Sequence, residues 1–191
     1  YGERDRSQWN TMGQHDNWRH YERGMAHIKA KEYKFAETEF NYYLNHPELH
    51  RHMFGIAYFG RGLMFEALGN DGSAIKEYRM AVENDLHPTV KMTIKAYINI
   101  GAIYMRNKAY QDAINAYSKA IENSPKNGLA HYYLGLAYLR AGEYEKAEQE
   151  SEEAKRLGIT FTALSDKLSE MKKNSSKSDK TNKTNQSEPT N

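Results

Sequence analysis

The chain has 191 residues and a mass of 22.1 kDa, which is enough for one domain with a hydrophobic core. The net charge is only +2, so the composition indicates neither nucleic-acid nor membrane-surface binding. Cysteine is absent, which excludes disulfides, thiolate metal sites and a cysteine nucleophile. No apolar run reaches the roughly 18 residues that span a bilayer, and we expect a soluble protein of undetermined compartment.

The first fifteen residues are polar and predict no regular element. Tyr1, Trp9 and Met12 are spaced too irregularly for the apolar face of a helix. Residues 1–15 are therefore interpreted as an N-terminal arm that is either ordered or frayed. Because the sequence starts with Tyr1 and not Met, both a removed presequence and a fragment of a longer chain stay open.

From residue 24 to residue 147, small residues recur with one spacing. Four glycine–alanine pairs, each twelve residues apart, are Gly24–Ala36, Gly62–Ala74, Gly101–Ala113 and Gly135–Ala147. Four residues after each alanine come Phe40, Tyr78, Tyr117 and, in the last case, Ser151. This pattern predicts two antiparallel helices per repeat, with small residues at their close approach and the aromatic ring filling the wedge between them.

The repeats resemble the tetratricopeptide repeat family. Two stretches carry the resemblance: Tyr97, Ile100-Gly101, Tyr104, Ala113, Tyr117, Ala120, Pro125, and Leu134-Gly135, Tyr138, Gly142, Tyr144, Ala147, Ala154. The resemblance implies an all-α fold, a right-handed α-solenoid of about four helix-turn-helix repeats within residues 16–173. The repeats are expected near 17–50, 55–88, 94–127 and 128–161. The motif says little about function.

The first two repeats depart from the family pattern. Their junctions carry insertions of four and five residues, near His46-Pro47 and around Pro88, and we expect the following helices to start early. Tyr43 replaces a small alanine, and Arg23 and Arg61 replace the leucine before glycine. The N-terminal half is therefore expected to deviate from regular stacking, and a partner could enter there.

After the fourth repeat, residues 160–173 are expected to form one more helix. Phe161, Leu164, Leu168 and Met171 form a narrow apolar stripe. A capping helix that seals the last repeat is the preferred interpretation, and a docking helix for another chain is the alternative. Residues 174–191 contain no apolar residue and are expected to be a disordered polar tail.

In the family, the first helices of successive repeats line a concave groove, and the resemblance implies that this groove binds peptides here. The candidate ligand-binding residues are Trp18, Tyr21, Met25, Lys29, Phe59, Leu63, Ile98, Asn99, Arg106, Tyr132, Leu136 and Arg140. The matching positions also include Ile28, Leu129 and Leu139. This apolar surface with a basic rim predicts a partner with apolar anchors and nearby acidic residues.

Some family members bind acidic C-terminal tails through a clamp of Lys, Asn and Arg side chains. Only Asn99 lies at a matching position, which argues against that function. Occupation of the groove by the N-terminal arm or by a second copy of the protein is the competing interpretation.

No motif for catalysis, metal or cofactor binding is present. There is no phosphate-binding glycine loop, metalloprotease helix or nucleophile elbow. His46, His50 and His52 cluster around Pro47, where a polar junction loop is preferred over a weak metal site. We therefore expect no enzyme and no cofactor, but a protein-interaction module, an adaptor or assembly scaffold. A structural subunit that self-associates into an oligomer or filament is the alternative.

Overall fold

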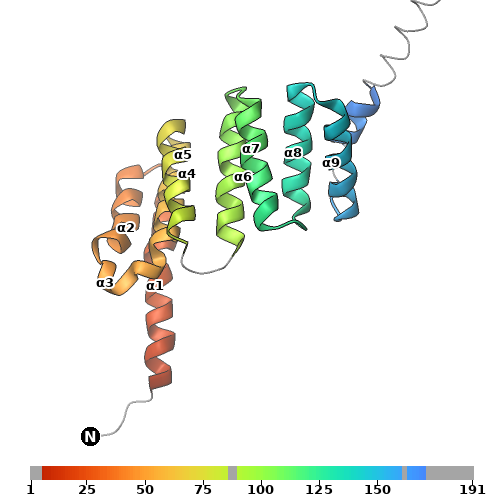
Figure 1. Cartoon of the computed structure of the whole chain (residues 1–191). Coiled ribbons are helices and arrows are strands. Elements are labelled where there is room, and N and C mark those ends of the chain that lie inside the picture. Colours follow the sequence, from red (N-terminus) through yellow and green to blue (C-terminus); the bar gives the residue numbers. More distant parts are fainter. Residues whose placement is uncertain (1–5, 86–89, 161–162, 171–191) are drawn as a thin grey trace, which may run out of the picture. The chain divides into compact units, whose positions relative to one another are not determined.

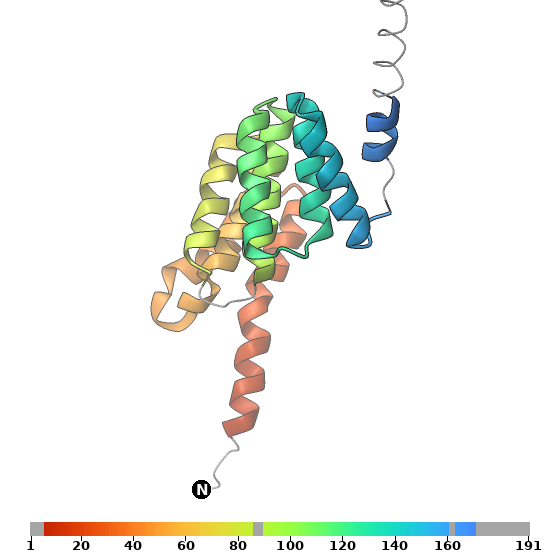
Figure 2. The same cartoon turned by 45° about the vertical axis from the view of Figure 1, so that its right-hand side comes forward.

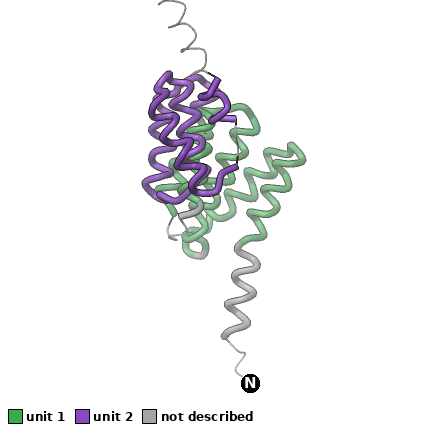
Figure 3. The backbone as a smooth tube through the Cα atoms, turned by 90° about the vertical axis from the view of Figure 1, so that its right-hand side faces the viewer, with its two compact units in different colours: residues 1–103 green, residues 104–191 purple. Residues whose placement is uncertain are grey.

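The structure is a computed structural model that describes residues 6–85, 90–160 and 163–170, with side chains from Trp18 onward except at 49, 90 and 91. Within these ranges all regular structure is helical, which confirms the all-α class. The chain divides into two compact units, one up to Ile103 and one from Tyr104, which are described separately (Figure 3). The expected tail at 174–191 lies outside the described residues, as do Phe161 and Met171 of the C-terminal stripe.

The first unit is built from helix pairs (Figure 1). In chain order its elements are α1 (Arg6–Lys29), α2 (Tyr33–Asn45), α3 (Pro47–His50), a 3₁₀ turn (Arg51–Met53), α4 (Phe54–Ala67), α5 (Asp71–Glu83) and most of α6 (Val90–Arg106). Helix α1 packs on α2 and α4, and α4 packs on α2 and α5. Residues 6–15, for which the apolar spacing predicted no helix, continue α1 as its first turns.

The first junction is ordered. Pro47 stands in the first turn of α3, where its missing N–H removes no helix hydrogen bond, and the 3₁₀ turn leads directly into α4. The second insertion, at residues 86–88, lies outside the described residues. Tyr43, which replaces the small family residue, is fully buried beside Met53 and Ala57. Its hydroxyl accepts a hydrogen bond of 2.9 Å from the Tyr21 N–H, and burial raises its pKa to about 12.

The predicted close approach at the repeat glycines is confirmed. The ring of Phe40 lies against both Gly24 of α1 and Gly60 of α4, and a Cβ at either glycine would collide with it. A Cβ at Gly62 would come within 2.6 Å of the Tyr78 ring. Both rings are fully buried, so the missing side chains create the space that these aromatics fill.

A left-handed residue ends the first helix of each repeat, always seven positions after the repeat glycine. These residues are Lys31 (φ 62°), Gly69 (φ 72°), Lys108 (φ 60°) and Gly142 (φ 83°). At each turn the next backbone N–H donates to the carbonyl five residues before it, as from Glu32 to His27 at 2.8 Å. This is the Schellman arrangement, which satisfies carbonyls that the helix end leaves open.

The second unit contains the end of α6, then α7 (Tyr110–Asn123), α8 (Gly128–Ala141) and α9 (Tyr144–Arg156), followed by a short helical segment at 163–170 (Figure 2). Helix α8 packs on α7 and α9. The Asn127 side chain caps α8 by accepting a hydrogen bond of 3.0 Å from the Ala130 N–H.

The segment at 163–170 contributes to the core of this unit. Leu164 is fully buried and Leu168 nearly so, and both cluster with Ala147. A Cβ at Gly135 would lie 2.6 Å from Leu164 Cδ2. Leu164 thus lies against the glycine of the only repeat in which the aromatic position holds a serine, Ser151.

Candidate functional site

Helix α1 carries an apolar row that we call the Trp18 row: Trp18, Tyr21, Met25 and Ile28. Three of its members are partly buried against the cluster that contains Phe40. Trp18 is different, because 47% of its surface is exposed although its ring packs edge-on against Tyr21, with 5.9 Å between ring centroids. The row therefore has one large exposed aromatic side chain, Trp18, beside three side chains that are packed against the core.

The other candidate residues of the first unit differ in accessibility. Phe59 was expected to face a groove, but it is only 8% exposed, and its ring centroid lies 5.4 Å from that of Tyr78. It is a core residue, because Gly60 lets this part of α4 approach α2 closely and Gly62 lets it approach α5. Leu63, Ile98 and Asn99 are partly buried, and Lys29 is exposed at the end of α1.

Arg61 is engaged within the unit. Its guanidinium donates to Glu77 Oε1 at 3.0 Å and to Asn41 Oδ1 at 3.2 Å. Burial raises the pKa of Glu77, and the positive charge of Arg61 opposes that rise. Arg61, at the position where the family pattern has leucine, is thus the cationic partner of a buried carboxylate on α5.

In the second unit the candidate residues of α8 fall into two groups. Tyr132, Leu136 and Leu139 pack against the cluster formed by Ala147 and the two leucines of segment 163–170. Leu129 is 41% exposed, and Arg140 is exposed at the end of the helix. Arg106 is also exposed, at the end of α6. The apolar positions are thus partly covered by the chain's own C-terminal segment.

Two histidine–glutamate pairs at equivalent repeat positions were missed by the sequence reasoning. His20 Nδ1 lies 2.5 Å from Glu39 Oε2, and His131 Nδ1 lies 2.6 Å from Glu150 Oε2. Each histidine stands four residues before its repeat glycine, and each glutamate three after its repeat alanine. The repeat register contained this signal, because equivalent positions of two helix pairs carry the same residues. Each pair ties the two helices of one repeat together.

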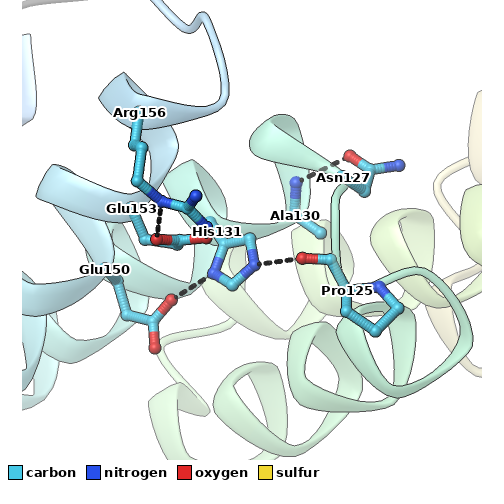
Figure 4. Close-up of polar contacts among 7 residues, drawn as sticks. All are labelled: Pro125, Asn127, Ala130, His131, Glu150, Glu153 and Arg156. Atoms are coloured by element: carbon cyan, nitrogen blue, oxygen red, sulfur yellow. Dashed lines mark hydrogen bonds and ion pairs between the residues drawn. The ribbon is translucent and has the colours of Figure 1, made fainter.

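The second of these pairs also holds a loop (Figure 4). His131 Nε2 lies 3.0 Å from the carbonyl oxygen of Pro125, so the two ring nitrogens face two acceptors. Both hydrogen bonds form together when the ring carries protons on both nitrogens. On α9, Glu153 pairs with Arg156 one turn away. His131 thereby connects the α7–α8 turn to α9.

The histidines around Pro47 form packing contacts. His46 Nδ1 lies 2.8 Å from the Tyr42 carbonyl oxygen, and the His50 ring packs beside Tyr42 and Tyr43. Burial lowers the pKa of His50, as do the positive charges of neighbouring histidines. Among the described residues, no group of three or more His, Asp or Glu side chains could hold a metal ion. In the same residues no helix is long and apolar enough to cross a membrane.

Comparison with known proteins places the repeats in a family. Residues 98–159 match the family model described as tetratricopeptide repeat. The chain is 34% identical to the human intraflagellar transport protein 88 homolog over 95 residues, which are 50% of this chain and 11% of that protein. The chain therefore spans about a tenth of that relative's length.

Solved structures show the same fold. MamA residues 41–end from Desulfovibrio magneticus RS-1 superpose with a TM-score of 0.64 at 18% identity, over 84% of this chain and 86% of that one. The first TPR domain of Spaghetti (RPAP3), bound to an HSP90 peptide, has a TM-score of 0.56 at 16% identity, over 65% and 98%. Residues 98–159 thus carry tetratricopeptide repeats, and the glycine contacts and left-handed helix ends of the earlier helix pairs follow the same pattern.

Proposed function

We propose that this chain is a protein-interaction module, an adaptor or assembly scaffold that binds a peptide segment or a partner subunit on its first helices. The observation that carries the proposal is the exposure of Trp18 on a supported apolar row of α1. Aromatic anchors carry much of the binding energy of protein interfaces, and Trp18, unlike the exposed Phe35, continues a row of apolar side chains on one helix. The structurally similar TPR domain of Spaghetti (RPAP3), which is bound to an HSP90 peptide, supports the same class of function.

The expected ligand has apolar anchors and acidic residues beside them. The Trp18 row offers a ring and partly exposed aliphatic carbon, and it ends at the exposed ammonium group of Lys29. Opposite charges at the rim of an interface mainly set orientation and association rate, whereas the aromatic anchor sets most of the affinity. The family is in general non-catalytic, and we propose a binding role without a reaction.

Substitution of Trp18 by Ala tests the proposal. Peptides that bind the full chain are first selected from a displayed random library, and their affinities are then measured by fluorescence anisotropy. Loss of an aromatic anchor removes about 2 kcal/mol, so the W18A variant should bind roughly 30-fold more weakly. Phe35 on α2 provides the matched control, because it is 61% exposed but lies outside the row. F35A should bind like the unmodified chain.

Two outcomes would contradict the proposed surface. One is unchanged binding by W18A with the helical circular dichroism intact, and the other is an equal loss in F35A. Light scattering on the same samples tests the structural alternative, because a self-associating subunit gives oligomers without added peptide, whereas the proposed module stays monomeric.

A further inference from the structure

The helical segment at 163–170 is held by two side chains. Leu164 and Leu168 are one helical turn apart and are buried, whereas its other residues, 163, 165–167, 169 and 170, are exposed. Among the described residues of this helix, Leu164 and Leu168 are the ones buried against α8 and α9, so their contacts dock it there. The described part of the segment is thus an amphipathic helix that is bound through a leucine at i and another at i+4.

The surface beneath these leucines is a defined receptor, which we call the Leu164 site: Tyr132, Gly135, Leu136, Leu139 and Ala147. All five residues lie on α8 and α9, and none belongs to the segment that they hold. Gly135 lacks a Cβ where Leu164 Cδ2 lies, so the receptor contains a hole that fits a branched aliphatic side chain. The site therefore fits the shape of a leucine side chain. The polar side of the bound helix faces away from the site and is exposed.

Between α9 and the segment, the structure describes residues 157–160 of the connection. Leu157 and Ile159 pack against Gly128 at the start of α8, and Gly158 turns the backbone with φ of 90°. Thr160 is exposed. The contacts of Leu157 and Ile159 with Gly128 are thus separate from those of Leu164 and Leu168 with the cluster around Ala147.

We propose that segment 163–170 is an exchangeable ligand that the chain itself provides, and that the Leu164 site binds an amphipathic helix of a partner protein with leucines one turn apart. The proposal rests on the proposed function, since Tyr132 and Leu136 are, like the members of the Trp18 row, candidate ligand-binding residues on the first helix of a repeat. A short tether gives the internal helix an effective concentration near the millimolar range, so only a partner helix with stronger contacts or better helix formation displaces it. The segment thereby sets the minimum affinity that a partner helix needs in order to occupy the Leu164 site.

The test changes the helix-forming tendency of the segment without touching its leucines. Asp166 and Lys167 are exposed, so D166G/K167G weakens the internal helix while D166A/K167A loses the same charges and keeps helix formation. The probe is a fluorescein-labelled peptide with the sequence of residues 160–173, measured by anisotropy against each full-length variant. The glycine variant should bind it about 30-fold more tightly than the alanine variant.

Equal affinities of the two variants would overturn the proposal. So would equal binding of a control peptide in which both leucines are replaced by Asp. A concentration-dependent dimer of the glycine variant would assign the site to a second copy of the chain and overturn the partner-helix assignment. Binding of this probe is measured separately from binding of the peptides selected for the Trp18 row, so failure here is distinguishable from failure of the proposed function.

Discussion

Leu164 lies against Gly135 as the aromatic rings of Phe40 and Tyr78 lie against Gly24 and Gly62. The last repeat has Ser151 at the position of those rings, and a leucine from a later part of the chain fills the space instead. The fourth helix pair therefore depends on residues outside the repeat for its close packing, whereas the first two pairs use an aromatic of their own second helix.

Gly135→Ala should destabilise the second unit. The new methyl group would lie 2.6 Å from Leu164 Cδ2 and 3.3 Å from the Ala147 carbonyl oxygen. Overpacking costs roughly 1–3 kcal/mol, and better helix propensity returns about 1, so we expect a net loss of about 1 kcal/mol in urea unfolding.

A double-mutant cycle separates this collision from other effects. In the background of Leu164→Ala the methyl group finds room, so Gly135→Ala should there be neutral or stabilising. Gly72 of α5 has no atom within 4 Å of an added Cβ, and Gly72→Ala should gain stability. Additive effects of the two changes at 135 and 164 would contradict the packing relationship.

The repeat structure could be predicted from the sequence because it repeats. The glycine–alanine spacing predicted helix pairs with aromatic wedges, and the glycine contacts of Phe40 and Tyr78 confirm that packing. The all-α class, which the family resemblance implied, is confirmed within the described residues. The contact of Leu164 with Gly135 could not be read in this way, because it joins two segments that no repeat spacing relates.

The accessibility of single side chains was harder to predict. Phe59 was placed in a groove by family position, but Gly60 and Gly62 bring this part of α4 close to its neighbours and bury the ring. The helical residues 6–15 lack an apolar period, so no pattern indicated their helix. The ligand-binding role of the candidate residues stays a prediction that the experiments above address.

Lys31→Gly and Lys108→Gly should each stabilise the protein by about 0.5–1 kcal/mol. Both lysines are exposed and hold positive φ values, which cost a side-chain-bearing residue about 1–2 kcal/mol. Glycine removes this cost but also loosens the unfolded chain, so only part of the gain is retained. Thermal and urea unfolding measure the effect.

The equivalent glycines provide the reverse experiment. An added Cβ at Gly69 or Gly142 meets no atom within 4 Å, so Gly→Ala there tests the backbone alone and should lose about 1 kcal/mol. Loss of stability in both lysine variants would show that their side chains contribute more than the strained turns cost.

Arg61→Leu restores the family residue and should nevertheless destabilise the first unit by about 2 kcal/mol. The substitution leaves Glu77 buried without its cationic partner. The expected loss is smaller than for a fully buried ion pair, because the Arg61 side chain is partly exposed. Arg61→Leu/Glu77→Leu should recover most of the loss, because both charges are then removed. Urea unfolding of the three proteins measures this, and a double variant as unstable as Arg61→Leu would contradict it.

The pH response of that single variant provides a second reading. Burial raises the pKa of Glu77, and Arg61 opposes the rise, so loss of Arg61 moves this pKa further up. A carboxyl group with a raised native pKa costs stability when it is ionised, and this cost disappears as pH falls through the native pKa. The deficit of Arg61→Leu against the unmodified chain should therefore shrink on acidification.

His50 makes the first unit sensitive to acid. Burial lowers its pKa below the ordinary value of 6.5, the charges of His52, His46 and His20 lower it further, and Glu48 opposes them. Its Nδ1 atom is buried without a hydrogen-bond partner, so protonation in place gains no compensating bond. Below pH 6.5 the unfolded chain takes up the proton first, which draws the equilibrium toward unfolding.

His50→Gln should therefore flatten the pH dependence of stability between pH 7.5 and pH 5. The unmodified chain loses stability as pH falls below 6.5, and the variant, which cannot bind that proton, loses less. Urea unfolding followed by circular dichroism at several pH values measures the difference. His27→Gln is the matched control, because His27 lies farther along α1 beside Glu32 and is not among the histidines whose charges act on His50. An equal flattening in both variants would show that the acid response does not come from His50.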